Sequence, residues 1–211
     1  MKIGLSKSLT LLELIIGLVL LTIVVLTLSS VDFFSRTHII TSSRMATLSN
    51  EVSLALEHMS KEITRAIGNT AIAEQDPINL DNISGDSAIR VYVDQNQNGQ
   101  RDDPGEGDRW IAYRWTAANG NQNDRYQIWY CPDCQNNQCT RCDPVWGNAG
   151  NIVARHISQF TPLQPANTNY VEVEITACWN PTDAGCGTVN NPANPAVRMR
   201  SRIRMPSVSN N

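Results

Sequence analysis

An uncharged apolar run near the N-terminus constrains the fold of this chain more than any other feature. The 18 residues from Leu14 to Val31 carry no charge and are mostly Leu, Ile and Val. A helix that begins at Leu9 and includes this run, rising about 1.5 Å per residue, is long enough to cross the roughly 30 Å hydrocarbon core of a bilayer. Lys2 and Lys7 precede the run and predict a cytoplasmic N-terminus with the remainder of the chain exported. Residues 9–31 are therefore predicted to be a transmembrane segment.

Two other membrane-targeting interpretations fit parts of this segment. It has the basic start and apolar core of a secretory signal peptide, with the small residues Thr27 and Ser29 as a weak cleavage site. It also has the composition of a plain signal anchor. The signal-peptide interpretation fits less well because the apolar run is too long, Glu13 interrupts its start, and helical patterning continues past its end.

The helical patterning continues as an amphipathic stripe between Arg36 and Gly68, where no proline occurs. Apolar residues recur there at spacings of three and four: Met45, Leu48, Val52, Ala55, Leu56, Met59, Ile63, Ala66 and Ile67. We therefore expect one helix from about Leu9 to Ile67 and assign residues 9–70 to it, with Gly68 and the following asparagine as the C-terminal stop. The stripe requires a globular domain to cover it.

Residues 71–211 are expected to form an exported, globular, β-rich domain. Short segments of alternating apolar and polar side chains predict its strands: Ala88–Val93, Trp110–Trp115, Tyr126–Tyr130, Ile152–Phe160, Tyr170–Thr176 and Val197–Met205. Alternation of this kind predicts an antiparallel sheet with one covered face, and the helical stripe is its natural cover. The predicted fold class is α+β, with a long N-terminal helix packed on an antiparallel sheet.

The segment SLTLLEL at residues 8–14 resembles the type IV prepilin signature, in which a short basic leader ends in a small residue. Ser8 stands where that family usually has glycine, and Leu9 stands where it usually has phenylalanine. The resemblance implies that residues 1–8 are a leader, that a prepilin peptidase cuts between Ser8 and Leu9, and that the new amine on Leu9 is methylated. It also implies that Glu13 meets the N-terminal amine of a neighbouring subunit in a filament. Ionisable groups within membranes are usually paired, so such a pair would set the assembly register.

The order of segments is most similar to PilW-like minor pilins and to the J-type minor pseudopilins of type II secretion. This resemblance implies a structural subunit that acts in assembly or initiation of a type IV pilus or pseudopilus. The implied partners are other pilins or pseudopilins, the prepilin peptidase and the inner-membrane assembly platform. The implied location is the inner membrane, with one span and an exported C-terminal domain, and then the filament. The alternative is a membrane-anchored, calcium-dependent adhesive or binding module.

A loop rich in oxygen-bearing side chains follows the first predicted strand. Acidic and amide residues occupy positions one, three, five and nine from Asp94, with Gly99 at position six, which is the spacing that Ca²⁺ loops use. Gly105 stands at position twelve, where an EF-hand has an acid, so the loop is more similar to the calcium loops of extracellular bacterial β-modules. The expected ligands are Asp94, Asn96, Asn98, Gln100, Asp102 and Glu106. The alternative is a solvent-exposed polar turn.

Six cysteines lie beyond residue 130. Four of them form two CxxC pairs that could bind zinc or form disulfides: Cys131, Cys134, Cys139 and Cys142. Export to an oxidising compartment favours disulfides, and a nested pairing of the outer two and the inner two is geometrically reasonable. Cys178 and Cys186 predict a further loop-closing disulfide.

The sequence offers little for catalysis or for nucleic-acid binding. The net charge is −3, which is not the basic footprint of a nucleic-acid-binding domain. No GxSxG or HExxH motif occurs, and the three histidines form no catalytic pattern. Alternating arginines at 198, 200, 202 and 204 share one face of a strand, which we expect to face solvent. We therefore expect a non-enzymatic protein that binds no nucleic acid.

Overall fold

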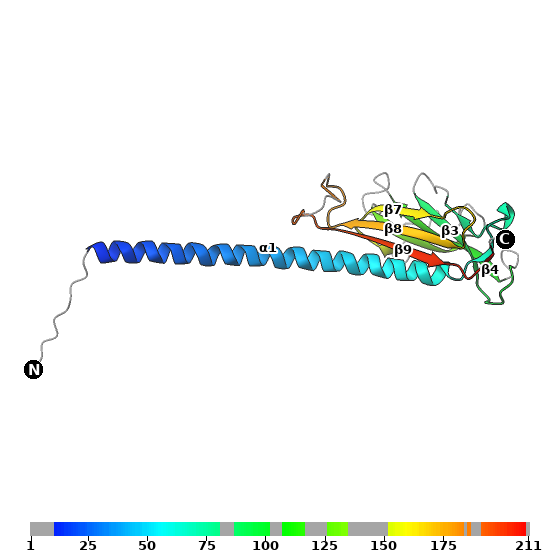
Figure 1. Ribbon diagram of the computed structural model, residues 1–211, viewed down its shortest axis with the longest axis horizontal. Helices are drawn as coiled ribbons and strands as arrows, with labels where there is room; N and C mark the ends of the chain where they lie inside the picture. Colours follow the sequence, from blue (N-terminus) through cyan, green and yellow to red (C-terminus); the bar gives the residue numbers. More distant parts are fainter. Residues whose placement is uncertain are drawn as a thin grey trace, which may run out of the picture. The chain divides into compact units, whose positions relative to one another are not determined.

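The computed structural model describes residues 11–80, 87–101, 107–116, 126–134, 152–183, 185–186 and 191–209. The chain divides into two compact units, Met1–Ser42 and Ser43–Asn211. One helix, α1 (Leu11–Ile63), runs from the first unit into the second (Figure 1). The remaining elements are β1 (Ile67–Asn69), the 3-10 helix η1 (Ala73–Gln75), β2 (Ile78–Asn79), β3 (Ala88–Asp94), β4 (Asp108–Thr116), β5 (Gln127–Cys134), β6 (Ile152–Ala154), β7 (Ile157–Leu163), β8 (Tyr170–Cys178), β9 (Ala196–Arg204) and β10 (Ser207–Ser209).

The described part of the first unit is the apolar half of α1. Among the described residues, α1 is the one helix that is long and apolar enough to cross a membrane, and its apolar segment is not buried by the rest of the chain. The hydroxyl groups in this segment bond to backbone carbonyls of the preceding turn: Thr22 to Leu18, Thr27 to Ile23 and Val24, Ser29 to Val25, and Ser30 to Thr27. These hydroxyl groups are therefore satisfied within the helix, as a hydrocarbon environment requires.

The second unit packs the other half of α1 against β-strands. The buried residues of α1 form one stripe at helical spacing: Leu48, Val52, Ala55, Met59 and Ile63. They share one apolar core with inward-facing residues of several strands, such as Ile89 of β3, Ile111 of β4 and Val173 of β8. Each such side chain stabilises the fold by about 1.5–3 kcal/mol relative to its exposed state.

The strands form three sheets. Five strands pair in the order β2-β3-β4-β5-β6, and three pair in the order β7-β8-β9, both antiparallel throughout. β7, β8 and β9 lie side by side (Figure 1). The backbone amide of Ile157 in β7 donates to the carbonyl of Tyr126, and the indole of Trp115 donates to the carbonyl of Ile157, so the two larger sheets are joined at this point. These features confirm the predicted α+β class, with a helix packed on antiparallel strands.

The predicted C-terminal end of the helix was wrong. α1 ends at Ile63, and the chain then turns so that Ala66 bridges Val93 of β3 and residues 67–69 form β1, which is parallel to β10. Ala66 lies in this turn and Ile67 in the short strand, and both are buried. Their apolar side chains fit the helical spacing in the sequence, although the helix has already ended. Gly68 has φ 155°, and a Cβ atom there would collide with the carbonyl oxygen of Gln75. Gly68 thus allows the backbone of η1 to approach β1 closely.

The segment expected to be one strand at 152–160 is two, β6 and β7, which belong to different sheets. His156 lies between them with φ 60°, a left-handed conformation that breaks the strand. A carboxylate oxygen of Glu51 on α1 lies 3.3 Å from the backbone nitrogen of Arg155, which donates to it, and 3.3 Å from Nδ1 of His156. The ring of His156 stacks on Trp179 at 5.4 Å. Contacts with α1 and with the end of β8 therefore hold the break in place.

Candidate functional site

Glu13 lies in the first turn of α1, within the apolar segment. A carboxylate at a helix N-terminus interacts favourably with the helix dipole and with cations near that end. The proposed cleavage position, Ser8–Leu9, lies outside the residues that the structure describes. The processing of the N-terminus and the pairing of Glu13 with an amine therefore stay predictions.

Asp94 and Asp108 face each other at the loop end of the β3–β4 hairpin. Asp94 is the last residue of β3 and Asp108 is the first of β4, and the two are cross-strand partners. Both are buried, with 8% of Asp94 and 1% of Asp108 exposed. Side chains of cross-strand partners lie on the same face of a sheet with their Cβ atoms about 5 Å apart. The hairpin thus brings two acidic side chains together away from solvent.

Backbone amides of the loop turn both carboxylates toward the loop. The amide of Gly99 donates to Oδ2 of Asp94 at 2.9 Å, and the amide of Gln95 donates to Oδ1 of Asp108 at 3.3 Å. Gly99 has φ 73° and Gln97 has φ 58°, so the chain curls twice through the left-handed region within this loop. Oδ1 of Asp94 is buried and accepts no hydrogen bond in the part of the chain that the structure describes.

The other predicted calcium ligands divide into two groups. Asn96 and Asn98 lie in the described loop, where their side-chain oxygens accept from the amides of Asn98 and Gln100 at 3.0 and 2.7 Å. Asp102 and Glu106 lie outside the described residues. Among the residues that are described, no three His, Cys, Asp or Glu side chains gather as a metal-binding group. Ca²⁺ also takes amide and backbone oxygens, so two carboxylates with amide neighbours fit its chemistry.

Asp108 lies outside the calcium-loop motif predicted from the sequence. It follows Asp94 by 14 residues, beyond the span of that motif. The signal that could have found it is strand register: the first residue of β4 pairs with the last residue of β3 in a hairpin. An acid at the start of one predicted strand and another at the end of the preceding strand would have suggested the pair.

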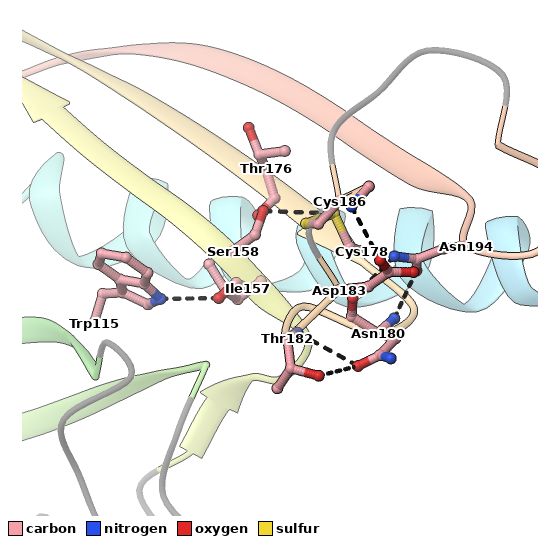
Figure 2. The surroundings of a disulfide bond; sticks show 11 residues. Trp115, Ile157, Ser158, Thr176, Cys178, Asn180, Thr182, Asp183, Cys186 and Asn194 are labelled. Carbon is pink, nitrogen blue, oxygen red and sulfur yellow. Dashed lines mark hydrogen bonds between the residues drawn. A yellow bond between two sulfur atoms is a disulfide. The ribbon is translucent and has the colours of Figure 1, made fainter.

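The predicted disulfide between Cys178 and Cys186 is present, with Cα atoms 5.7 Å apart. It closes the turn that follows β8 (Figure 2). The buried side chain of Asn194 supports the same turn, since its Oδ1 accepts from the amide of Asn180 at 2.7 Å and its Nδ2 donates to the carbonyl of Asn180 at 2.9 Å. Figure 2 shows these contacts beside the sulfur atoms. A covalent link and a buried amide together fix this loop.

Cys131 lies in β5, is fully buried and takes part in a disulfide. The side chains of Cys134, Cys139 and Cys142 lie outside those that the structure describes. The connectivity of these four cysteines therefore stays a prediction, and so does the less favoured alternative that the CxxC pairs bind zinc.

The arginine side chains of β9 pair with acids of β8 on an exposed sheet face. Arg198 contacts Glu174 at 2.6 Å, and Arg200 and Arg202 both contact Glu172. Hydrogen bonds from Arg200 and then Arg202 hold the pKa of Glu172 below its usual value. Much of the positive charge of this face is thus matched within the sheet.

The buried aromatic residues around His58 form a structural contact between α1 and the sheet. Nδ1 of His58 lies 2.8 Å from the hydroxyl of Tyr113 on β4, and its ring lies 4.8 Å from that of Tyr130 on β5. Burial lowers the pKa of His58, while burial raises the pKa of Tyr130 to about 12 and that of Tyr113 further still. These groups are therefore neutral near pH 7.

No model of a known protein family matches the chain, and no curated protein or solved structure matches it significantly.

Proposed function

We propose that this chain is a filament subunit of the type IV pilin kind, a minor pilin or pseudopilin that acts in assembly or initiation of a pilus or of a type II secretion pseudopilus. The proposal joins the prepilin-like segment at residues 8–14 with a helix that continues for 53 residues into a β-domain. In this role the chain would be processed at Ser8–Leu9, methylated on Leu9 and taken up by an inner-membrane assembly platform.

The observation that carries the proposal is that exposed apolar side chains continue beyond the length that a membrane needs. Asp32 and Arg36, an exposed ion pair 2.9 Å apart, mark where the uncharged run has ended. Phe33 and Phe34 are 75% and 70% exposed, and Ile39 is 64% exposed. Large apolar patches on a soluble surface usually mark interaction sites. Neighbouring helices in a filament would cover these residues, whereas a simple membrane anchor would leave them in water.

Glu13 would specify the register of that packing. An ionised carboxylate within a membrane carries a desolvation cost, and a cationic chain end on the neighbouring subunit would offset this cost only in one register. The two acids of the described first unit, Glu13 and Asp32, therefore have different expected roles. Asp32 is already paired with Arg36 on its own helix.

The test compares Glu13→Gln with Asp32→Asn, expressed in the native host at equal levels. We expect Glu13→Gln to abolish sheared filaments and co-purification of other pilins, and Asp32→Asn to leave both close to wild type. Intact-mass measurement of the mature protein should show a methylated N-terminus at Leu9. Normal assembly of the Glu13→Gln protein, or a mature chain that still begins at Met1, would contradict the proposal.

The second candidate is a calcium-dependent adhesive or binding module on a membrane anchor. It is favoured by the buried Asp94–Asp108 pair, which a filament subunit does not require. Under this candidate, Glu13→Gln would leave surface display and adhesion intact, while chelation of calcium would remove adhesion. The same pair of variants therefore distinguishes the two functions.

A further inference from the structure

We propose that the loop end of the β3–β4 hairpin binds a calcium ion between Asp94 and Asp108, with Asn96 and Asn98 of the loop as neighbouring oxygen donors. This inference does not depend on a role in filaments. It differs from a loop motif read from sequence because its centre is a cross-strand pair, and one of its two acids lies outside that motif.

Asp94 and Asp108 place two acidic side chains opposite each other on neighbouring strands. Like charges directly opposite each other on two strands are destabilising, and burial makes their repulsion stronger. Asp94 and Asp108 are both more than nine-tenths buried. A backbone amide donates a hydrogen bond to each carboxylate. A bound divalent cation would offset the repulsion between two carboxylates that lie opposite each other.

The second argument is an oxygen atom with no hydrogen bond. Oδ2 of Asp94 accepts from Gly99, but Oδ1 of the same carboxylate is buried and accepts nothing in the described part of the chain. Buried carboxylate oxygens are normally satisfied, and an exception requires an explanation such as an ion. Since Gly99 lies in the loop after β3, the carboxylate of Asp94 is turned toward the described part of that loop. A cation there would complete its coordination.

The third argument concerns which cation fits. The donors are carboxylate and amide oxygens of a curled loop, without a cysteine or histidine among the four proposed residues. Oxygen donors of this kind favour Ca²⁺ or Mg²⁺ over zinc. An irregular loop suits the flexible coordination of Ca²⁺ better than the strict octahedral coordination of Mg²⁺. The guanidinium of Arg65 donates to the backbone carbonyls of Asp94 and Gln95, so it holds the end of β3 through the main chain.

The main test measures the thermal unfolding of the full-length chain in detergent micelles, in 10 mM calcium and in chelator. For a dissociation constant of about 10⁻⁴–10⁻³ M, we expect calcium to raise the melting temperature by about 3–10 °C. Asp94→Asn keeps the shape of the side chain but removes its charge, and we expect it to abolish the shift. Glu57→Gln, which removes an exposed acid of α1, should keep the full shift. In chelator, Asp94→Asn should melt no lower than wild type because the repulsion with Asp108 is gone.

A second measurement uses the wild-type chain, so that it does not depend on a folded Asp94 variant. Trp110 and Tyr92 are cross-strand partners two positions along the hairpin from the acidic pair, with ring centroids 5.3 Å apart. Terbium bound between the acids should therefore emit when tryptophan is excited at about 295 nm, and calcium should quench this emission by displacement while magnesium at equal concentration should not. Trp110→Phe should lose most of the emission.

The outcomes are distinct. A calcium-dependent shift that is lost in Asp94→Asn and kept in Glu57→Gln, together with terbium emission that requires Trp110, supports the site. Absence of any shift or emission in the wild-type chain overturns the proposal. A shift that persists in Asp94→Asn, or emission that persists in Trp110→Phe, also overturns it, because calcium would then bind elsewhere.

Discussion

The hydroxyl of Tyr113, at the centre of β4, lies 2.8 Å from Nδ1 of His58 on α1. Tyr113 is fully buried, so this contact places a hydrogen bond in the core between the helix and the larger sheet. It is a polar link between the second half of α1 and the strands, and the effect of its removal on stability can be measured directly.

We expect Tyr113→Phe to lower the free energy of unfolding by about 1–2 kcal/mol, because His58 loses a hydrogen-bond partner in a partly buried position. Chemical denaturation of the full-length chain in micelles measures this change. Tyr126→Phe is the matched control, because Tyr126 lies just before β5 and is only half-buried. We expect it to change the free energy of unfolding by less than about 0.5 kcal/mol. Equal effects of the two variants would show that the Tyr113 contact is not stabilising.

The same histidine predicts a pH dependence. Burial lowers the pKa of His58, with the Glu62 carboxylate opposing this shift and Lys61 adding to it. In the unfolded chain a histidine has a pKa of about 6.5, so the unfolded state binds more protons as the pH falls below that value. The stabilising contribution is therefore complete above about pH 7 and is lost as the pH falls through the lowered folded-state pKa. Between pH 7 and 5, wild type should lose more stability than His58→Gln, whereas parallel curves would contradict this assignment.

The buried stripe of α1 predicts a contrast between neighbouring positions on one helix. Met59 is fully buried, while Leu54 is 54% exposed. We expect Met59→Ala to lower the free energy of unfolding of the second unit by about 2–5 kcal/mol because it leaves a cavity, and Leu54→Ala to lower it by less than about 1 kcal/mol. Tryptophan fluorescence during denaturation follows the unfolding of the β-domain. Similar losses for both variants would mean that the stripe is not buried as described.

Removal of the disulfide after β8 should lower the free energy of unfolding. Cys178 and Cys186 are eight residues apart, and a link of that length stabilises a fold by about 2–3 kcal/mol in the chain-entropy account. The double variant Cys178→Ala/Cys186→Ala should show this loss in denaturant while the disulfide at Cys131 remains. Thiol labelling and peptide mapping of the unfolded wild-type chain should find no free thiol at Cys178 or Cys186. A free thiol at Cys178 or Cys186 would contradict the pairing.

Elements with a complete periodic signal could be predicted from the sequence. The alternation at 88–93 and at 170–176 predicted strands, and β3 and β8 lie there with slightly extended ends, although β3 is buried along its whole length. The break at His156 could not be predicted, because it depends on Glu51 of α1, more than 100 residues earlier in the chain. The pairing of β1 with β10 escaped prediction for the same reason: two three-residue segments carry almost no pattern, and their partnership is set by the folded core.

The candidate site shows the same limit. Spacing identified Asp94, Asn96 and Asn98, because a calcium loop has a local motif. Asp108 belongs to the site through its register with Asp94, which is a property of the paired strands and not of the motif. Oδ1 of Asp94 accepts no hydrogen bond from the described residues, and this too is a property of the folded chain, because folding buries that atom.

The hydroxyl groups of Thr22, Thr27 and Ser29 donate to carbonyls of their own helix, one turn earlier. These three side chains hence require no outside acceptor, whether lipid tails or other proteins surround them. Moving the segment out of a bilayer and into a bundle of like segments would break none of these bonds. The hydroxyl groups stay hydrogen-bonded within the helix in either environment. The free-energy cost of leaving the lipid therefore comes mainly from apolar contacts that the new surroundings do not replace.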